Sequence, residues 1–199
     1  GRSIRRGVIN SFDRFHDFER TMQLNYFGAL RLIMGFLPKM IEQRRGHIIN
    51  ISSIGVLSNA PRFSAYVASK AALDSFSACA SSEFLDKGIN FTTINMPLVR
   101  TPMIAPTKIY ESVPTLSPEE AADLVVNAIL HRPVRIASRL GIFGAICHAA
   151  APKLTQVMLN TAFNMFPDSS AALGKKGGEP QPLTPEQMAF AQITQGIHW

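Results

Sequence analysis

Two short apolar runs, separated by a long segment rich in alanine and serine, constrain the fold of this chain more than any other feature. The runs are HIINIS at 47–52 and INFTTINM at 89–96, and both contain several β-branched side chains, as buried strands do. The segment 63–87 between them suits a helix, which Gly88 would end. A strand, a helix and a strand in this order predict a right-handed β-α-β unit with parallel strands, and therefore an α/β fold.

Helical segments are predicted on both sides of this unit. In residues 17–45 apolar side chains recur at helical spacing, although Pro38 is expected to kink or loosen the last turns. The letters SPEE at 117–120 combine a capping-box pattern with proline at the first helical position, and they open a helix that runs to about His131. A last short strand is expected at 134–137.

The rest of the chain divides into a loop, an apolar region and a tail. Residues 97–116 are rich in proline and are predicted to form a lid, because long loops within compact domains are usually functional. Residues 140–166 are mostly apolar and helical, with a break at a proline. We expect one domain over 1–173, a flexible linker at 174–183, and a docking helix at 184–199.

The charge and the cysteine content narrow the classes of partner and compartment. The net charge of +6 is scattered along the chain without interleaved aromatic residues, so nucleic-acid binding is not expected. A phosphate-bearing cofactor or substrate, an anionic membrane surface, or solubility alone could each account for this charge. Cys79 and Cys147 are the only cysteines, which favours reduced thiols in the core of a cytoplasmic protein, with peripheral membrane contact left open. The histidines show no metal-ligand spacing, so no metal site is expected.

Three residues around the predicted β-α-β unit suit carbonyl chemistry. Tyr66 and Lys70 stand four residues apart, so the phenol and the ammonium share one helix face. A nearby cation favours the phenolate and would lower the pKa of Tyr66 from its usual value of about 10. Such a phenol can exchange a proton with a carbonyl oxygen, and Ser53, at the end of the first strand, can hydrogen-bond the same oxygen. The trio predicts proton-coupled reduction of a carbonyl group.

The glycine-rich turn of a dinucleotide-binding fold is absent from this sequence. No G-x-G-x-x-G pattern follows either predicted strand. Two explanations stay open at this point. Either the function uses no dinucleotide, or the sequence is the C-terminal part of a longer protein.

Asn25 lies on the first predicted long helix, and the first predicted strand ends with the letters NISS. The spacing of Asn25, Ser53, Tyr66 and Lys70 is that of one protein family. The chain resembles the short-chain dehydrogenases/reductases. The resemblance implies the C-terminal part of a Rossmann-like, doubly wound parallel sheet, without its N-terminal strands and glycine-rich turn. It implies that Tyr66 is the catalytic acid and that Ser53 holds the substrate oxygen. It further implies that Lys70 binds the nicotinamide ribose and that Asn25 holds a water that relays protons to Lys70.

The same resemblance implies further contacts with a nicotinamide cofactor, beyond those of Tyr66 and Lys70. Gly1 stands where the family's N-N-A-G motif ends. Thr101 and Val99 take the places of a threonine and a backbone group that contact the nicotinamide. The family usually reads P-G-x-x-x-T here, whereas this chain reads MPLVRT, which leaves the backbone path of the loop open.

A closer similarity is to the bacterial long-chain fatty acyl-CoA reductases, through stretches such as INISSIG, APRFSAYVASKAALD and the ending GIHW. It implies NADPH-dependent reduction of a fatty acyl-CoA to a fatty aldehyde, with an apolar groove for the chain supplied by 103–116 and 140–166. The long helices 17–45 and 63–87 form the dimer face of the family, so a homo-oligomer is expected. Two alternatives stay open: a dehydrogenase for a ketone, a hydroxyl lipid or a sterol, and a non-catalytic fragment for dimerisation or lipid-surface binding.

Overall fold

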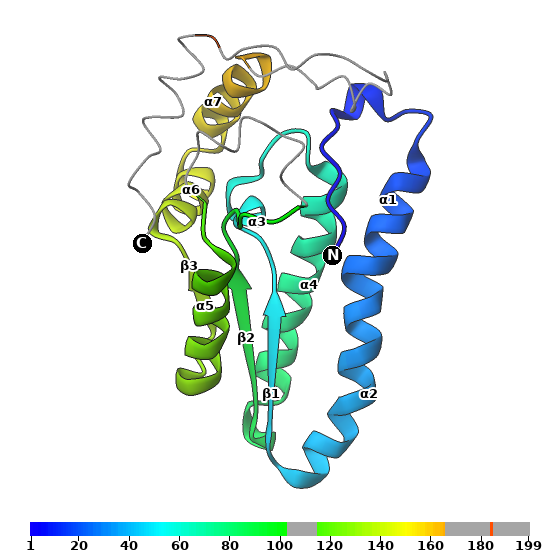
Figure 1. Cartoon of the computed structure of the whole chain (residues 1–199), viewed down its shortest axis with the longest axis vertical. Helices are drawn as coiled ribbons and strands as arrows, with labels where there is room; N and C mark the ends of the chain where they lie inside the picture. Colours follow the sequence, from blue (N-terminus) through cyan, green and yellow to red (C-terminus); the bar gives the residue numbers. More distant parts are fainter. Residues whose placement is uncertain (103–114, 166–183, 185–199) are drawn as a thin grey trace.

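The computed structural model describes residues 1–102, 115–165 and 184, and Figure 1 shows how its elements are arranged. The predicted linker at 174–183 and nearly all of the predicted helix at 184–199 lie outside these residues, as does most of the predicted lid. In chain order the elements are η1 (Val8–Asn10), α1 (Phe15–Met22), η2 (Gln23–Phe27), α2 (Gly28–Gln43), β1 (Gly46–Ile51), α3 (Ile54–Ser58), α4 (Ser64–Glu83), η3 (Leu85–Lys87), β2 (Ile89–Asn95), α5 (Pro118–His131), β3 (Arg135–Ala137), α6 (Arg139–Ala150) and α7 (Pro152–Met165).

Three parallel strands form the sheet, in the order β1-β2-β3. β1 pairs along its whole length with β2, from Gly46 opposite Ile89 to Ile51 opposite Ile94, and β3 pairs with the second half of β2. α4 lies between β1 and β2 in the chain and α5 lies between β2 and β3, so two crossover units succeed one another. The predicted α/β fold with parallel strands is confirmed, and the carboxyl ends of the strands share one edge of the sheet.

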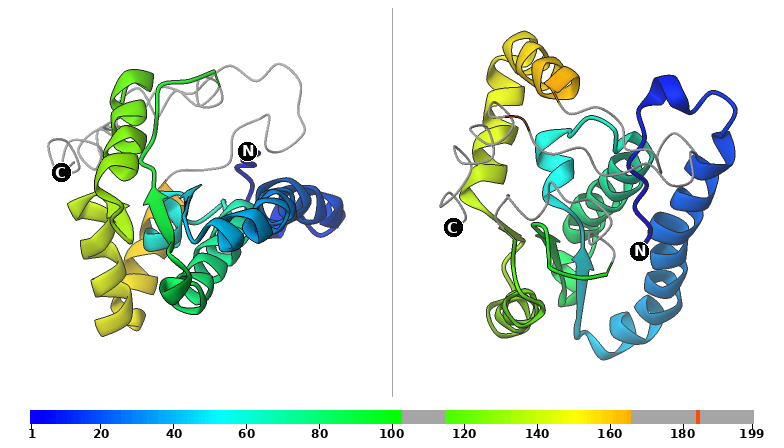
Figure 2. Two further views of the ribbon diagram at one scale, coloured as in Figure 1. Left: turned by 90° about the horizontal axis from the view of Figure 1, so that it is seen from below. Right: turned by 45° about the horizontal axis from the view of Figure 1, so that its top comes forward.

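Helices cover both faces of the sheet, which is the doubly wound arrangement. α2 and α4 pack on one face, and α5 packs on the opposite face, as the left-hand view of Figure 2 shows. Because side chains alternate along a strand, Ile89 and Phe91 enter the core between β2 and the first pair of helices, whereas Ile94 turns to the other side. The buried apolar residues of this core are Ile33, Leu37, Leu73, Ala80, Ile89 and Phe91.

The predicted long helix at 17–45 is a succession of three stretches rather than one regular helix. α1 ends at Met22, the single π turn η2 follows, and α2 then continues to Gln43. Pro38 lies inside α2, and the helix continues beyond it. Periodicity does not predict the π turn, because one extra residue in a turn changes the apolar spacing too little to be recognised.

Most other predicted elements agree with the structure to within a few residues. The strand at 134–137 is β3, and the apolar stretch 140–166 is α6 and α7, separated just before Pro152. α5 begins with the predicted capping box. The Glu120 N–H donates to Ser117 Oγ at 3.1 Å, and the Ser117 N–H donates to the Glu120 carboxylate at 2.6 Å.

Two further features differ from the expectations. α3 is missed because its five residues are too few to show a helical period. The prediction that both cysteines are core residues is wrong: Cys79 is exposed on α4, Cys147 is half-buried on α6, and both thiols are free. The residues that α4 buries recur three and four positions apart, which places Cys79 outside the buried face.

Gly88 is required by the turn between η3 and β2. Its backbone is left-handed, with φ 74°, and a Cβ there would lie 2.3 Å from the carbonyl oxygen of Arg44. Gly88→Ala is therefore expected to lower the free energy of unfolding by about 2 kcal/mol. Urea unfolding followed by circular dichroism measures the change.

The matched control is Gly35→Ala, because Gly35 lies within α2 and the space around its Cβ position is open. This substitution is expected to raise the free energy of unfolding by about 0.5–1 kcal/mol. Equal effects of the two substitutions would contradict the role assigned to Gly88.

Candidate active site

The candidate active site lies at the carboxyl ends of the parallel strands, where open α/β sheets bind their ligands. Ser53 follows β1 closely, with an extended backbone, and it is the N-cap of α3. Its hydroxyl oxygen accepts a hydrogen bond from the Gly55 N–H at 3.1 Å. Ser53 is buried, so its hydroxyl is held in one orientation at the point where the strand gives way to the helix.

Tyr66 lies in the first turn of α4, and its side chain meets Ser53. Burial raises the pKa of the Tyr66 phenol, and the side-chain hydrogen bond with Ser53 acts in the opposite direction without outweighing burial. The structure thus brings together two of the residues that the sequence singles out. A phenol in this setting keeps its proton at neutral pH.

Lys70 follows Tyr66 by one turn of α4, but its ammonium group bonds to the strand. Lys70 Nζ donates a hydrogen bond to the carbonyl oxygen of Ile51, at the end of β1, at 2.7 Å. Burial lowers the pKa of Lys70, and the carboxylate of Asp74, one further turn along α4, opposes this effect. The prediction that Lys70 lowers the pKa of Tyr66 is wrong. The pKa of Tyr66 is raised, because the effect of burial is the largest one.

Asn25 lies in the π turn, and its amide joins three segments of the chain. Asn25 Oδ1 accepts from the Arg2 N–H and Asn25 Nδ2 donates to the Arg2 carbonyl oxygen, both at 2.8 Å. Nδ2 also donates to Ser69 Oγ at 3.0 Å, and the Ser69 hydroxyl donates to the Tyr66 carbonyl oxygen at 2.7 Å. Both amide hydrogens are thus used, and one lone pair of Oδ1 is left for the predicted relay water.

Gly1 lies beside two of the other predicted site residues. A Cβ at Gly1 would be 3.2 Å from Asn25 Oδ1 and 3.9 Å from Lys70 Nζ. The missing side chain therefore keeps the space next to the Lys70 ammonium open. The opening beside the Lys70 ammonium fits a hydroxyl-bearing group such as the ribose of a nicotinamide cofactor.

Val99 and Thr101, the remaining predicted cofactor contacts, lie in the segment that follows β2. Val99 forms a parallel bridge with Leu116, made by two backbone hydrogen bonds of 2.8 and 2.9 Å. These bonds fasten the two ends of the predicted lid to each other. Thr101 is exposed, and in the described part of the chain no hydrogen bond joins its side chain to Tyr66 or Lys70.

Sequence reasoning misses a buried polar network behind the site. The side-chain amide of Asn95, at the end of β2, donates to Asp74 Oδ2 at 3.0 Å and to the Ser53 carbonyl oxygen at 3.3 Å. Its oxygen accepts from Arg135 of β3 at 3.1 Å. The network connects the backbone of Ser53 to α4 and to both later strands. The only signal in the sequence is that Asp74 stands one turn after Lys70, on the same helix face.

A second polar contact holds the N-terminal segment, which carries Gly1, against α1. Asp17 is buried, accepts hydrogen bonds from Arg6 and Arg14, and has the Arg2 guanidinium 3.8 Å away. Burial acts to raise the pKa of Asp17, but the hydrogen bonds from the arginines outweigh it, and the pKa lies below its ordinary value. The carboxylate therefore stays ionised, and keeps the segment in place, well into the acidic range.

Several known proteins are similar to this chain in sequence. The family model described as short chain dehydrogenase matches residues 3–111. The chain is 63% identical over 199 residues to a fatty acyl-CoA reductase of Acinetobacter baylyi, and the match covers all of this chain and 66% of that protein. It is 52% identical over 203 residues to an uncharacterized oxidoreductase of Mycobacterium tuberculosis, covering all of this chain and 59% of that protein. A fatty acyl-CoA reductase of the same organism is 48% identical over 160 residues, with 80% of this chain and 54% of that protein covered.

Solved structures of the same architecture support the fold. A short chain dehydrogenase from Burkholderia cenocepacia, solved in complex with NADP, aligns with 80% of this chain and 65% of its own, at 23% identity and a TM-score of 0.69. A short-chain dehydrogenase from Streptomyces avermitilis aligns with 81% of this chain and 67% of its own, at 23% identity and a TM-score of 0.65. At this level of identity the agreement concerns the arrangement of helices and strands.

Removal of the Asp74 charge tests its effect on Lys70. In Asp74→Asn a neutral amide replaces the carboxylate that raises the pKa of Lys70, so this pKa is expected to fall further below its ordinary value. NMR titration of isotope-labelled lysine side chains measures the shift in the folded protein. Asp86→Asn is the control, because Asp86 lies in η3 at the other end of the sheet and is exposed. An unchanged Lys70 titration in Asp74→Asn would contradict this assignment.

Proposed function

This chain belongs to the short chain dehydrogenase family, and we propose that it carries the catalytic residues of an oxidoreductase that reduces a long-chain fatty acyl-CoA to a fatty aldehyde with NADPH. The observation that carries the proposal is the pairing of Tyr66 with Ser53 at the carboxyl edge of the sheet. A proton donor and a second hydroxyl at one place suit a carbonyl oxygen on which negative charge develops.

The names of the relatives support the substrate class. The Acinetobacter baylyi protein and one of the Mycobacterium tuberculosis proteins are fatty acyl-CoA reductases, and the first is 63% identical to this chain. The chain spans 66% of the former and 54% of the latter. Activity and substrate are therefore carried over to this chain as a proposal that rests on its own site residues.

A nicotinamide dinucleotide suits the residues beside Tyr66. Lys70 would donate hydrogen bonds to the ribose, and Gly1 would leave room for it. Val99 and Thr101, which follow β2, would contact the nicotinamide carboxamide. When bound, NADPH supplies the hydride that the thioester carbonyl carbon accepts.

Tyr66 acts first as an acid. As the carbonyl carbon is reduced, the carbonyl oxygen takes the phenolic proton and becomes the hydroxyl of a hemithioacetal. Tyr66 is protonated at neutral pH before this step, because burial raises the pKa of its phenol. The Ser53 hydroxyl donates a hydrogen bond to the same oxygen while the Gly55 N–H holds the serine in place.

Tyr66 then acts as a base. The hemithioacetal hydroxyl returns its proton to the phenolate, the carbon–oxygen double bond forms again, and the carbon–sulfur bond breaks. The CoA thiolate leaves and takes a proton from solvent, so the products are a fatty aldehyde and free CoA. During the interval in which Tyr66 is a phenolate, the Lys70 ammonium stabilises it, and Asp74 favours the charged lysine.

Two surfaces support further parts of the proposal. α1 and α2 expose large apolar side chains, among them Phe15, Leu32 and Phe36, which suits a homo-oligomer. α6 and α7 expose others, such as Phe143 and Met158, which suits peripheral contact with a lipid surface. Within the described residues, no helix has the length and the apolar character needed to cross a bilayer.

Replacement of the phenol tests the mechanism. Tyr66→Phe in the full-length natural polypeptide removes the proton donor, so kcat/KM for NADPH-dependent reduction of palmitoyl-CoA is expected to fall by at least about 100-fold. Formation of the aldehyde is followed by mass spectrometry, and consumption of NADPH by absorbance. Tyr26→Phe is the matched control, since Tyr26 packs against the apolar core and lies outside the site. It is expected to change the rate by less than about twofold, as surface or core hydroxyls remote from the chemistry do.

Several outcomes would overturn the proposal. Unchanged turnover in Tyr66→Phe would exclude Tyr66 as the acid. Reduction of ketones without any reduction of acyl-CoA would favour a dehydrogenase for a ketone, hydroxyl lipid or sterol. No reductase activity in the wild-type polypeptide towards any of these carbonyl compounds would favour a non-catalytic role in dimerisation or lipid-surface binding.

The absent glycine-rich turn predicts the behaviour of this 199-residue chain towards the cofactor. Without that turn the chain lacks the usual helix N-terminus for the pyrophosphate, so little or no binding of NADPH is expected. Fluorescence titration of the chain with NADPH measures the binding, and tight binding would contradict the expectation.

A further inference from the structure

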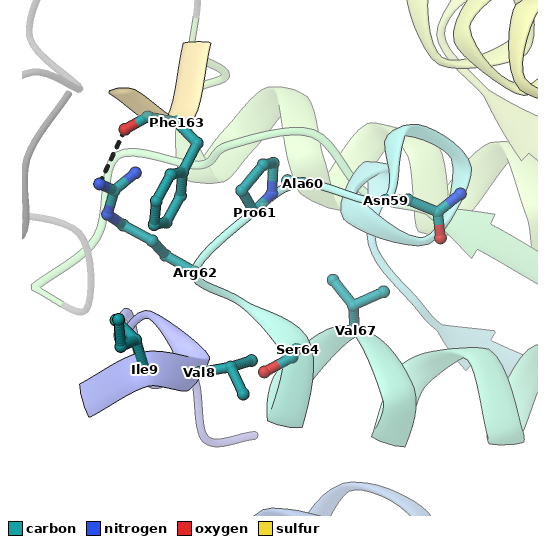
Figure 3. Close-up of a pocket in the computed structure, with 9 residues that line it drawn as sticks. All are labelled: Val8, Ile9, Asn59, Ala60, Pro61, Arg62, Ser64, Val67 and Phe163. Carbon is teal, nitrogen blue, oxygen red and sulfur yellow. Dashed lines mark hydrogen bonds between the residues drawn. The ribbon is translucent and has the colours of Figure 1, made fainter. Parts of the chain in front are cut away.

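A pocket of about 470 Å³ opens next to the start of α4, and none of the roles assigned above uses it (Figure 3). Its volume lies within the range of about 300–1,000 Å³ that small-molecule sites have. Three segments far apart in the sequence meet there: Val8 and Ile9 of η1, residues 59–67, and Phe163 of α7. Of the segments expected to supply an apolar groove, 140–166 contributes Phe163, and most of 103–116 lies outside the described residues.

The chemistry of the lining selects the kind of ligand. Valine, isoleucine, alanine, proline and phenylalanine make up most of the wall. Among the described residues of the wall, Arg62 alone is charged, and the protein itself binds its guanidinium. The guanidinium stacks 3.9 Å from the centre of the Phe163 ring and donates to the Phe163 carbonyl oxygen at 2.8 Å. Such a lining does not suit a nucleotide or the phosphates of CoA, whose charges need partners, and it does suit a hydrocarbon chain.

Arg62 joins the walls of the pocket to one another. Besides its contacts with Phe163, its carbonyl oxygen accepts a hydrogen bond from the Arg6 N–H at 2.8 Å, two residues before η1. Its backbone is left-handed, with φ 69°. A non-glycine residue persists in that conformation where the surrounding structure fixes it, and such residues cluster at ligand clamps.

The pocket adjoins the reacting groups through α3 and α4. Ser64 and Val67, which line it, stand on either side of Tyr66 in the chain. Val67 Cγ2 lies 3.4 Å from the Cβ position of Gly55, and the Gly55 N–H is the donor that holds Ser53 Oγ. Val67 therefore belongs both to the wall of the pocket and to the surroundings of the turn that holds Ser53, which places the pocket beside the site.

We propose that this pocket binds the alkyl chain of the acyl substrate, with Phe163 and Arg62 as one wall and the N-terminal residues Val8 and Ile9 as the other. The inference rests on the proposed function and adds to it the place of the acyl chain. Burial of one methylene multiplies affinity about fourfold. The pocket would therefore set the preference for long chains, while the thioester chemistry belongs to Tyr66 and Ser53.

Filling the pocket tests the inference. The full-length natural polypeptide is assayed with NADPH on palmitoyl-CoA and on butyryl-CoA, and the ratio of the two kcat/KM values is compared between variants. Ile9→Trp reduces the space, and exclusion of two methylenes is expected to lower the palmitoyl-to-butyryl ratio roughly 15-fold. Ile129→Trp is the matched control, because Ile129 is exposed on α5, and it is expected to keep the ratio within about twofold.

Phe163→Ala is the second variant, should Ile9→Trp fail to fold. It removes an apolar wall of the pocket and the ring on which the Arg62 guanidinium stacks. The palmitoyl-to-butyryl ratio of kcat/KM is expected to fall severalfold. A ratio that stays at the wild-type value in the folded variants, or a wild type without preference for palmitoyl-CoA, would overturn the inference. A wild type that reduces neither thioester would instead overturn the proposed function, so the two failures are distinguishable.

Discussion

The paired hydrogen bonds between the Asn25 side chain and the backbone of Arg2 hold together the segments on which the rest of this structure depends. Through Ser69 the same amide reaches the turn of α4 that carries Tyr66. An unsatisfied buried partner would cost about 1–3 kcal/mol, so the contact fixes the N-terminal segment where it runs. That segment then supplies one wall of the pocket at residues 8–9, so the site and the pocket share one anchor.

Burial, more than neighbouring charge, sets the protonation of the site. It raises the pKa of Tyr66 and lowers the pKa of Lys70, and both shifts favour the neutral form, as removal of water does. Asp74 limits the shift of the lysine, and Asn95 holds Asp74 in turn. A protonated phenol beside a fixed serine hydroxyl is the state from which reduction of a carbonyl begins. In the proposed mechanism Tyr66 is the acid, and the charge of Lys70 stabilises the phenolate that Tyr66 becomes.

In the two proposals, the start of α4 carries both the proton donor and part of the wall that binds the acyl chain. Tyr66 faces Ser53, whereas Ser64 and Val67, on either side of it, line the apolar pocket. A rigid helix with a buried face positions both sets of side chains more accurately than a loop would. The bridge between Val99 and Leu116 fixes the ends of the intervening segment at the same edge of the sheet. Substrate and cofactor would therefore meet on elements whose positions the parallel strands determine.

The sequence by itself determined the parallel β-α-β units and the capping box of α5. It also determined the spacing that marks Ser53, Tyr66 and Lys70 as a group. These features depend on periodicity and on neighbours a few residues apart. Only the tertiary structure decided the direction of the Tyr66 pKa shift, the partners of Asn25, the network through Asn95 and the apolar pocket. Each of these depends on burial or on contacts between residues distant in the sequence. Neither spacing nor composition records how much water a side chain loses when the chain folds around it.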